Sequence, residues 1–171
     1  MIAIDALHEV GKLWVQQRPG AQIVECAVGA HSGDTSLDVV EGGDIESMFP
    51  SVSGASEKSA STAVTKRTVK VRRLVDIVSE LGLTRAGIVS MDIEGYDYQA
   101  LKGIDFRSFS AAVFIIENNA HHGLGRDDIR DLMKSHAHIH AAKIWNLDDV
   151  FIHQDFLRLS SGAAARSSPV A

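Results

Sequence analysis

The sequence predicts an α/β protein built around a mostly parallel β-sheet. Short apolar runs typical of buried strands alternate along the chain with segments whose apolar residues recur at helical spacing. Towards the C-terminus, strand-like runs on either side of the turn 146–149 predict an antiparallel hairpin added to that sheet. With 171 residues, 45% of them hydrophobic, the chain is long enough for one domain with a buried core.

Each element follows from its local pattern. The predicted strands are apolar or alternating runs at 1–4, 23–28, 35–40, 68–71, 88–91, 111–116, 143–145 and 150–153. The predicted helices each carry one apolar face and cover 6–17, 74–81, 97–102 and 126–135. Pro19-Gly20, Gly82 and Gly103 are the stop signals after the first three helices.

Two further segments have distinctive compositions. Residues 42–66 are rich in Gly, Ser, Thr and Ala, which predicts a long loop of the kind that forms lids or binding segments. The run 66–73 alternates basic residues with Val69 and Val71, which predicts an edge strand with a solvated face. We therefore expect one domain over residues 1–157, followed by a disordered tail over 158–171.

Charge and cysteine content exclude several classes of protein. The formal net charge is −5, so a nucleic-acid partner is not expected. Cys26 is the single cysteine, which excludes an intrachain disulfide, and its apolar neighbours Val24 and Ala27 predict a buried, inert thiol. No apolar run reaches the roughly 20 residues of a membrane span, and the N-terminus lacks a signal-peptide pattern. We expect a cytoplasmic protein without a membrane partner.

Acidic residues follow three of the predicted strands, namely Asp5, Asp92 and Glu117. The carboxyl ends of parallel strands lie at one edge of a sheet, where ligands bind in open α/β folds. Such acids also start and cap helices, which is the alternative explanation for each one. Three acids at one edge favour a ligand site.

The longest of these acidic segments resembles a known family signature. Asp92-Ile93-Glu94-Gly95-Tyr96-Asp97, followed by Leu101-Lys102-Gly103, is similar to the signature of FkbM-type S-adenosylmethionine-dependent methyltransferases. Residues 4–5, 24–29 with Gly33, 69–77 and 113–117 are similar to further segments of the family in the same order. The resemblance covers most of residues 1–120 and weakens beyond them.

The resemblance implies a Rossmann-like methyltransferase sheet and methyl transfer from S-adenosylmethionine to a hydroxyl oxygen of a small molecule or sugar. Asp5 would hold the cofactor ribose, and Glu25, Cys26 and Ala27 would border the adenine. Asp92 and Glu94 would line the reaction centre as catalytic residues. Asp92 would also lie beside the cofactor, and it is the favoured base because it is nearest to the strand end.

The chain departs from the family pattern at its start. The family opens with a strand and a Gly-rich turn that approaches the methionine part of the cofactor. No residue precedes Met1, so this first strand and its helix are expected to be missing, and Gly29 and Gly33 follow the wrong strand to replace them. Activity would then require an upstream segment. The alternatives are a truncated, non-catalytic methyltransferase-like domain acting as a binding module or remnant, and self-association through the exposed sheet edge.

Metal binding is a further possibility. Asp92 with Glu117-Asn118 occupies positions similar to the magnesium ligands of catechol-type methyltransferases, which leaves open a magnesium-dependent enzyme that uses these carboxylates. His136, His138 and His140 alternate and could bind zinc on a strand face, although a solvated surface is the favoured explanation. His121-His122 could supply an acceptor-side base or be merely solvated.

Overall fold

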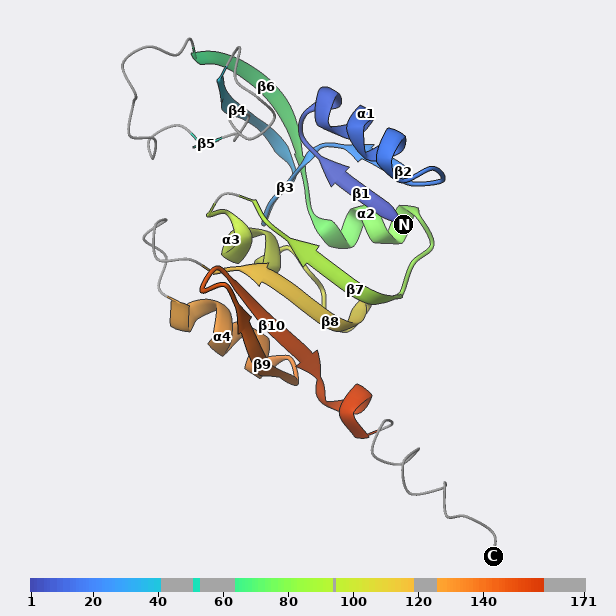
Figure 1. Ribbon diagram of the computed structural model, residues 1–171, viewed down its shortest axis with the longest axis vertical. Coiled ribbons are helices and arrows are strands. Elements are labelled where there is room, and N and C mark those ends of the chain that lie inside the picture. Colours follow the sequence, from blue (N-terminus) through green and yellow to red (C-terminus); the bar gives the residue numbers. More distant parts are fainter. Residues whose placement is uncertain (41–50, 53–63, 94, 119–125, 159–171) are drawn as a thin grey trace, which may run out of the picture. The chain divides into compact units, whose positions relative to one another are not determined.

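The computed structural model describes residues 1–40, 51–52, 64–93, 95–118 and 126–158 (Figure 1). Most of the predicted loop 42–66, Glu94, His121-His122 and nearly all of the predicted tail lie outside the described residues. The chain divides into two compact units, which we describe separately. The first unit comprises Met1–Ile77 and Gln99–Ile104, and the second comprises Val78–Tyr98 and Asp105–Ala171.

The first unit contains two small sheets and one long helix. Its elements are β1 (Ile2–Asp5), α1 (His8–Gln17), β2 (Gln22–Glu25), β3 (Ala27–Val28), β4 (Gly33–Val40), β5 (Ser51–Val52), β6 (Val64–Arg72), the first part of α2 (Leu74–Glu80) and the last part of α3 (Asp97–Lys102). β1 and β2 pair in parallel and are connected by α1 (Figure 1). The other sheet has the order β3-β6-β4-β5, with β3 parallel to β6 and the remaining pairs antiparallel.

Apolar side chains from α1 and the larger sheet form the core of this unit. Leu7, Leu37 and Val39 are buried together, and Ala6, Val10 and Val69 pack against them. α1 also lies close to β2, because a Cβ atom added at Gly11 would be 3.0 Å from the side chain of Ile23. Leu7 and Val10 of the apolar stripe predicted around α1 therefore pack in this core, whereas Trp14 is 39% exposed.

The second unit contains a four-stranded sheet with the order β7-β8-β10-β9. Its elements are the last part of α2, β7 (Arg85–Met91), the start of α3 (Asp97–Lys102), β8 (Ser110–Glu117), α4 (Arg126–Ser135), β9 (His138–Ile144) and β10 (Asp148–His153). β7 and β8 are parallel, whereas β10 is antiparallel to both β8 and β9. Phe114, Phe151, Ile116 and Met133 are buried completely or almost so in its core.

These elements confirm the α/β class and the C-terminal antiparallel hairpin. α3 and α4 span the predicted residues 97–102 and 126–135. Both are determined locally, by acids in the first turn and a lysine in the last, which suit the helix dipole. None of the helices in the described ranges is long and apolar enough to cross a membrane.

The expectation of one mostly parallel sheet is not confirmed by the described residues. They form three sheets with three parallel and four antiparallel strand pairs. The main cause is β4, which runs antiparallel along β6 from Gly33 to Val40. β6 also corrects two local predictions, because it starts at Val64 within the expected loop and has strands on both sides. Its alternating sequence indicates one solvated face, but it carries no information about what pairs along the strand edges.

In the described part of the chain, several parallel strands have a single strand partner, among them β1 in the first unit and β7 in the second. β1 pairs with β2, and β7 pairs with β8. Parallel strands are usually buried within a sheet and seldom form its edge. Ile88 on β7 is 65% exposed, which is unusual for a large apolar side chain on such a strand.

Candidate functional site

In the first unit, Asp5 and Glu25 occupy the ends of two adjacent parallel strands. They are partners in the β1–β2 register, and the Cys26 N–H donates to the Asp5 carbonyl oxygen at 2.9 Å. Asp5 Oδ1 accepts a hydrogen bond from the Leu7 N–H at 2.8 Å, so one carboxylate oxygen stabilises the turn into α1. Burial raises the pKa of Asp5, although backbone hydrogen bonds from Leu7 and Ala6 oppose this effect. Asp5 thus combines a structural contact with a strand-end position suited to binding.

The residues predicted to border the adenine differ in exposure. Glu25 is exposed and pairs with His8 at the surface, with 2.7 Å between Glu25 Oε2 and His8 Nδ1. Cys26 is buried, as predicted. Ala27 is half-buried and begins β3, where it pairs with Val71. The structure therefore brings Asp5, Glu25 and Cys26 together, and Ala27 follows them directly along the chain.

In the second unit, three carboxylates gather at one end of the sheet. Met91 pairs with Ile116 in parallel strands, so Asp92 and Glu117 directly follow a register pair. Asp148 at the start of β10 is opposite Glu117 in the antiparallel register. Burial raises the pKa of Asp148, and the negative charge of Asp92 raises it further. Asp92 itself is exposed and accessible to a ligand, whereas Glu94 lies outside the described residues.

Asp97, the last residue of the signature, is a buried carboxylic acid. Its side chain is only 2% exposed and lies in the first turn of α3. Oδ2 accepts a long hydrogen bond of 3.4 Å from the Ile93 N–H, and Oδ1 has no hydrogen-bond partner among the described residues. Burial raises the pKa of Asp97 to about 7, and the charge of Asp92 contributes to the rise. Gly95, with a φ of 86°, forms the tight turn between Asp92 and Asp97.

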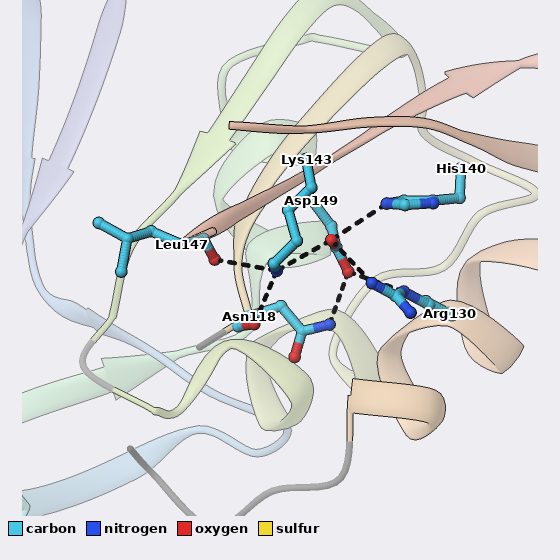
Figure 2. Close-up of polar contacts among 6 residues, drawn as sticks. All are labelled: Asn118, Arg130, His140, Lys143, Leu147 and Asp149. Atoms are coloured by element: carbon cyan, nitrogen blue, oxygen red, sulfur yellow. Dashed lines mark hydrogen bonds and ion pairs between the residues drawn. The ribbon is translucent and has the colours of Figure 1, made fainter. Parts of the chain in front are cut away.

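Asp149 is the centre of a second polar group in this unit (Figure 2). The Asp149 side chain is completely buried and accepts hydrogen bonds from four side chains. The donors are Asn118 Nδ2 at 2.7 Å, Arg130 Nε and Nη2 at 3.0 and 3.1 Å, His140 Nε2 at 3.0 Å and Lys143 Nζ at 3.1 Å. Burial alone would raise the pKa of Asp149, but the hydrogen bonds from Arg130, Asn118 and Lys143 outweigh it and hold the pKa well below its usual range.

Sequence reasoning missed both Asp97 as a buried acid and the group around Asp149. The sequence predicts a turn over 146–149, because Asp and Asn are typical of turns, whereas β10 already begins at Asp148. Their partners Asn118 and Arg130 are distant in the sequence, so no local signal could identify the group. The only local signal that Asp97 is buried is its position at the start of a short helix that contains the apolar residues Ala100 and Leu101.

The predicted histidine surface is wrong for His138. This residue is 2% exposed, packs edge-on against Phe114 with ring centroids 5.2 Å apart, and has a pKa lowered by burial. His136 stacks on Phe106 with ring centroids 4.1 Å apart, and His140 joins the group around Asp149. His138 and His140 lie on β9, whereas His136 precedes that strand, so only two of the three histidines lie on the predicted strand.

Neither metal hypothesis gains support from the geometry. In the described ranges, no group of three or more His, Cys, Asp or Glu side chains is placed to hold a metal ion. The magnesium site suggested by Asp92 and Glu117-Asn118 is therefore unsupported. Asn118 instead directs its amide nitrogen to Asp149 (Figure 2).

Comparison with known proteins identifies the family. The methyltransferase FkbM domain matches residues 2–140, which include the strand-end acids Asp5, Asp92 and Glu117 and the signature segment. No curated protein and no solved structure matches the chain. The match covers most of the sequence and includes Asp5, Asp92 and Asp97 at the positions described above. The chain belongs to the FkbM methyltransferase family.

Proposed function

We propose that this protein transfers a methyl group from S-adenosylmethionine to a hydroxyl oxygen of a small molecule or sugar. The observation that carries the proposal is the position of the signature segment. Exposed Asp92 lies at the carboxyl end of β7, beside the β8 end and Asp148. Ligands of open α/β sheets bind beyond this end of the strands, so the acids face the region where substrate would lie.

A Rossmann-like arrangement is the fold that best accommodates both units. The parallel β1–β2 pair connected by α1, and the sheet β7-β8-β10-β9 with its antiparallel C-terminal hairpin, are the kinds of pieces from which such a fold is built.

Asp5 and Glu25 fit the role of cofactor-binding residues. They supply carboxylate oxygens at adjacent strand ends, and such oxygens accept hydrogen bonds from a ribose diol. Hydrogen bonds to a charged acceptor contribute about 1.5–3 kcal/mol each, which is sufficient to orient a cofactor. When bound, S-adenosylmethionine supplies a methyl group that its sulfonium already activates. The protein mainly has to align the acceptor, exclude water and accept a proton.

Asp92 is the residue that we propose to accept the proton of the acceptor hydroxyl. It is exposed, follows the strand end directly and lies close enough to Asp148 to raise the pKa of that carboxyl. Glu94 lies outside the described residues, so its role as a second catalytic residue stays a prediction from the signature. A cytoplasmic location is consistent with the buried thiol of Cys26.

Calorimetric titration with S-adenosylmethionine tests the proposal. We expect measurable binding to the wild-type protein and at least about a tenfold weaker affinity for Asp5→Asn, from the loss of one charge-assisted hydrogen bond. The asparagine can still accept the hydrogen bond from the Leu7 N–H, so α1 should remain in place. Asp34→Asn is the matched control, because Asp34 is an exposed carboxylate that pairs with Lys70 at the surface of the same unit.

Two results would contradict the proposal. No binding heat from a folded wild-type chain would favour the non-catalytic alternative. Binding that is equally strong in wild type and in Asp5→Asn would remove Asp5 from the cofactor site.

A further inference from the structure

The group around Asp149 contains more positive than negative charge. Arg130 and Lys143 are both bonded to the single carboxylate of Asp149, and His140 adds a further donor. Oδ1 accepts from Arg130, His140 and Lys143, while Oδ2 accepts from Asn118 and Arg130. Both oxygens are saturated, so the carboxylate is fixed from several directions.

The group holds the end of β8 as well as Asp149. The Asn118 N–H donates to the Leu147 carbonyl oxygen at 2.9 Å, and Lys143 Nζ donates to the Asn118 carbonyl oxygen at 3.0 Å. The Asn118 side chain donates to Asp149. The backbone N–H, the backbone C=O and the side chain of one residue are therefore all bonded to the β9–β10 hairpin. Figure 2 shows the bonds of the C=O and of the side chain.

Asn118 directly follows Glu117, the strand-end acid that lies beside the end of β7 and Asp92. Arg130 brings α4 to the same carboxylate, because it contacts Asp149 through two nitrogens. The group thus connects the β8 end, the hairpin and α4 at the end of the sheet where Asp92 lies. A displacement of the β8 end would change the surroundings of Asp92.

We propose that Asp149 and Lys143 are positioning residues that fix the Glu117–Asn118 strand end beside Asp92 for methyl transfer. They act on the acceptor side of the site through Asn118. This role rests on the proposed function. It assigns alignment of the acceptor and binding of the cofactor to different sets of residues.

The test measures cofactor affinity and turnover in the same variants. Lys143→Met removes the bonds to Asn118, Leu147 and Asp149 but leaves Asp149 paired with Arg130, so the charge of the buried pair stays balanced. Asp149→Asn is the stronger variant, and Lys143→Met carries the test if Asp149→Asn does not fold. Lys134→Met is the control, because Lys134 is an exposed lysine in the last turn of α4.

Turnover is measured as release of S-adenosylhomocysteine from S-adenosylmethionine with a mixture of methyl glycosides and catechol as acceptors. We expect Lys143→Met to lower kcat at least tenfold and to leave the dissociation constant of S-adenosylmethionine within twofold of wild type. Lys134→Met should match wild type in both measurements. A merely structural role would weaken cofactor affinity and turnover together, in proportion to the unfolded fraction seen by circular dichroism.

The outcomes separate the two proposals. If the wild-type protein binds the cofactor but gives no turnover, the proposed function is contradicted, and so is the positioning role that depends on it. Turnover in wild type that is unchanged in Lys143→Met and in folded Asp149→Asn overturns the positioning role alone. A parallel loss of cofactor affinity and turnover also overturns it.

Discussion

The buried acid Asp97 should make the stability of the protein fall as the pH rises through the weakly acidic range. Its pKa is raised from 3.8 to about 7 by burial, so the folded chain keeps a proton that the unfolded chain has lost. The unfolded state binds fewer protons between these two values, and the free energy of unfolding therefore falls by about 1.4 kcal/mol per pH unit. The total effect approaches ~4 kcal/mol and is complete above the folded-state pKa.

Asp97→Asn removes this titration while preserving the shape of the side chain. The amide oxygen can still accept from the Ile93 N–H, whereas the new amide NH₂ adds a contribution that does not depend on pH. Between pH 4.5 and 8.5 the stability of the variant should rise relative to wild type by about 3 kcal/mol. The test is how the difference in free energy of unfolding between the variant and wild type changes with pH, and not the size of that difference at any one pH.

Urea unfolding followed by circular dichroism measures this difference at several pH values. Asp105→Asn is the contrasting variant, because the Arg107 N–H and the Ser108 hydroxyl lower the pKa of this exposed carboxyl. Because its pKa is lowered from 3.8, this carboxyl stays ionised in both the folded and the unfolded chain between pH 4.5 and 8.5, and its substitution should leave the pH dependence over that range almost unchanged. A difference between wild type and Asp97→Asn that stays constant over the whole range would refute the conclusion that burial shifts the titration of Asp97.

Three further predictions concern packing and the buried charge. Gly103→Ala should destabilise the fold by about 1–3 kcal/mol, because the added Cβ would collide with the carbonyl oxygen of Gly29. Gly33→Ala is the control and should be nearly neutral, because no atom lies within 4 Å of a Cβ added there. Thermal melting compares the two variants. Phe114→Ala should cost about 3–5 kcal/mol in urea unfolding, because its side chain is completely buried. Asp149→Ala should cost about 3–5 kcal/mol at pH 7, because it leaves the cations around it without their carboxylate; a loss below 1 kcal/mol would contradict this account.

Much of the secondary structure could be predicted from local pattern. α4 has acids in its first turn, a lysine in its last and buried Ile129 and Met133 on one face, all of which are visible in the sequence. β8 is a continuous apolar run that ends in Glu117. These signals are local because helix periodicity and capping depend only on nearby residues.

The pairing of strands was predicted less well. The alternation in β6 indicates a strand with one polar face, yet the sequence does not show that β3 and β4 lie on its two sides. Strand direction in the first unit likewise depends on β4 running back along β6. Both facts arise from contacts between segments that local periodicity does not connect.

The site shows the same division between local and distant information. The sequence alone determined the family signature, the strand-end positions of Asp5, Asp92 and Glu117, and the buried thiol of Cys26. Only the tertiary structure decided that Asp97 is buried and that Asp149, a turn residue by its sequence, accepts a hydrogen bond from Asn118, 31 residues away. The physical reason is that burial and charge pairing depend on which distant segments pack together, and these determine the pKa of each acid far more than its neighbours in the chain do.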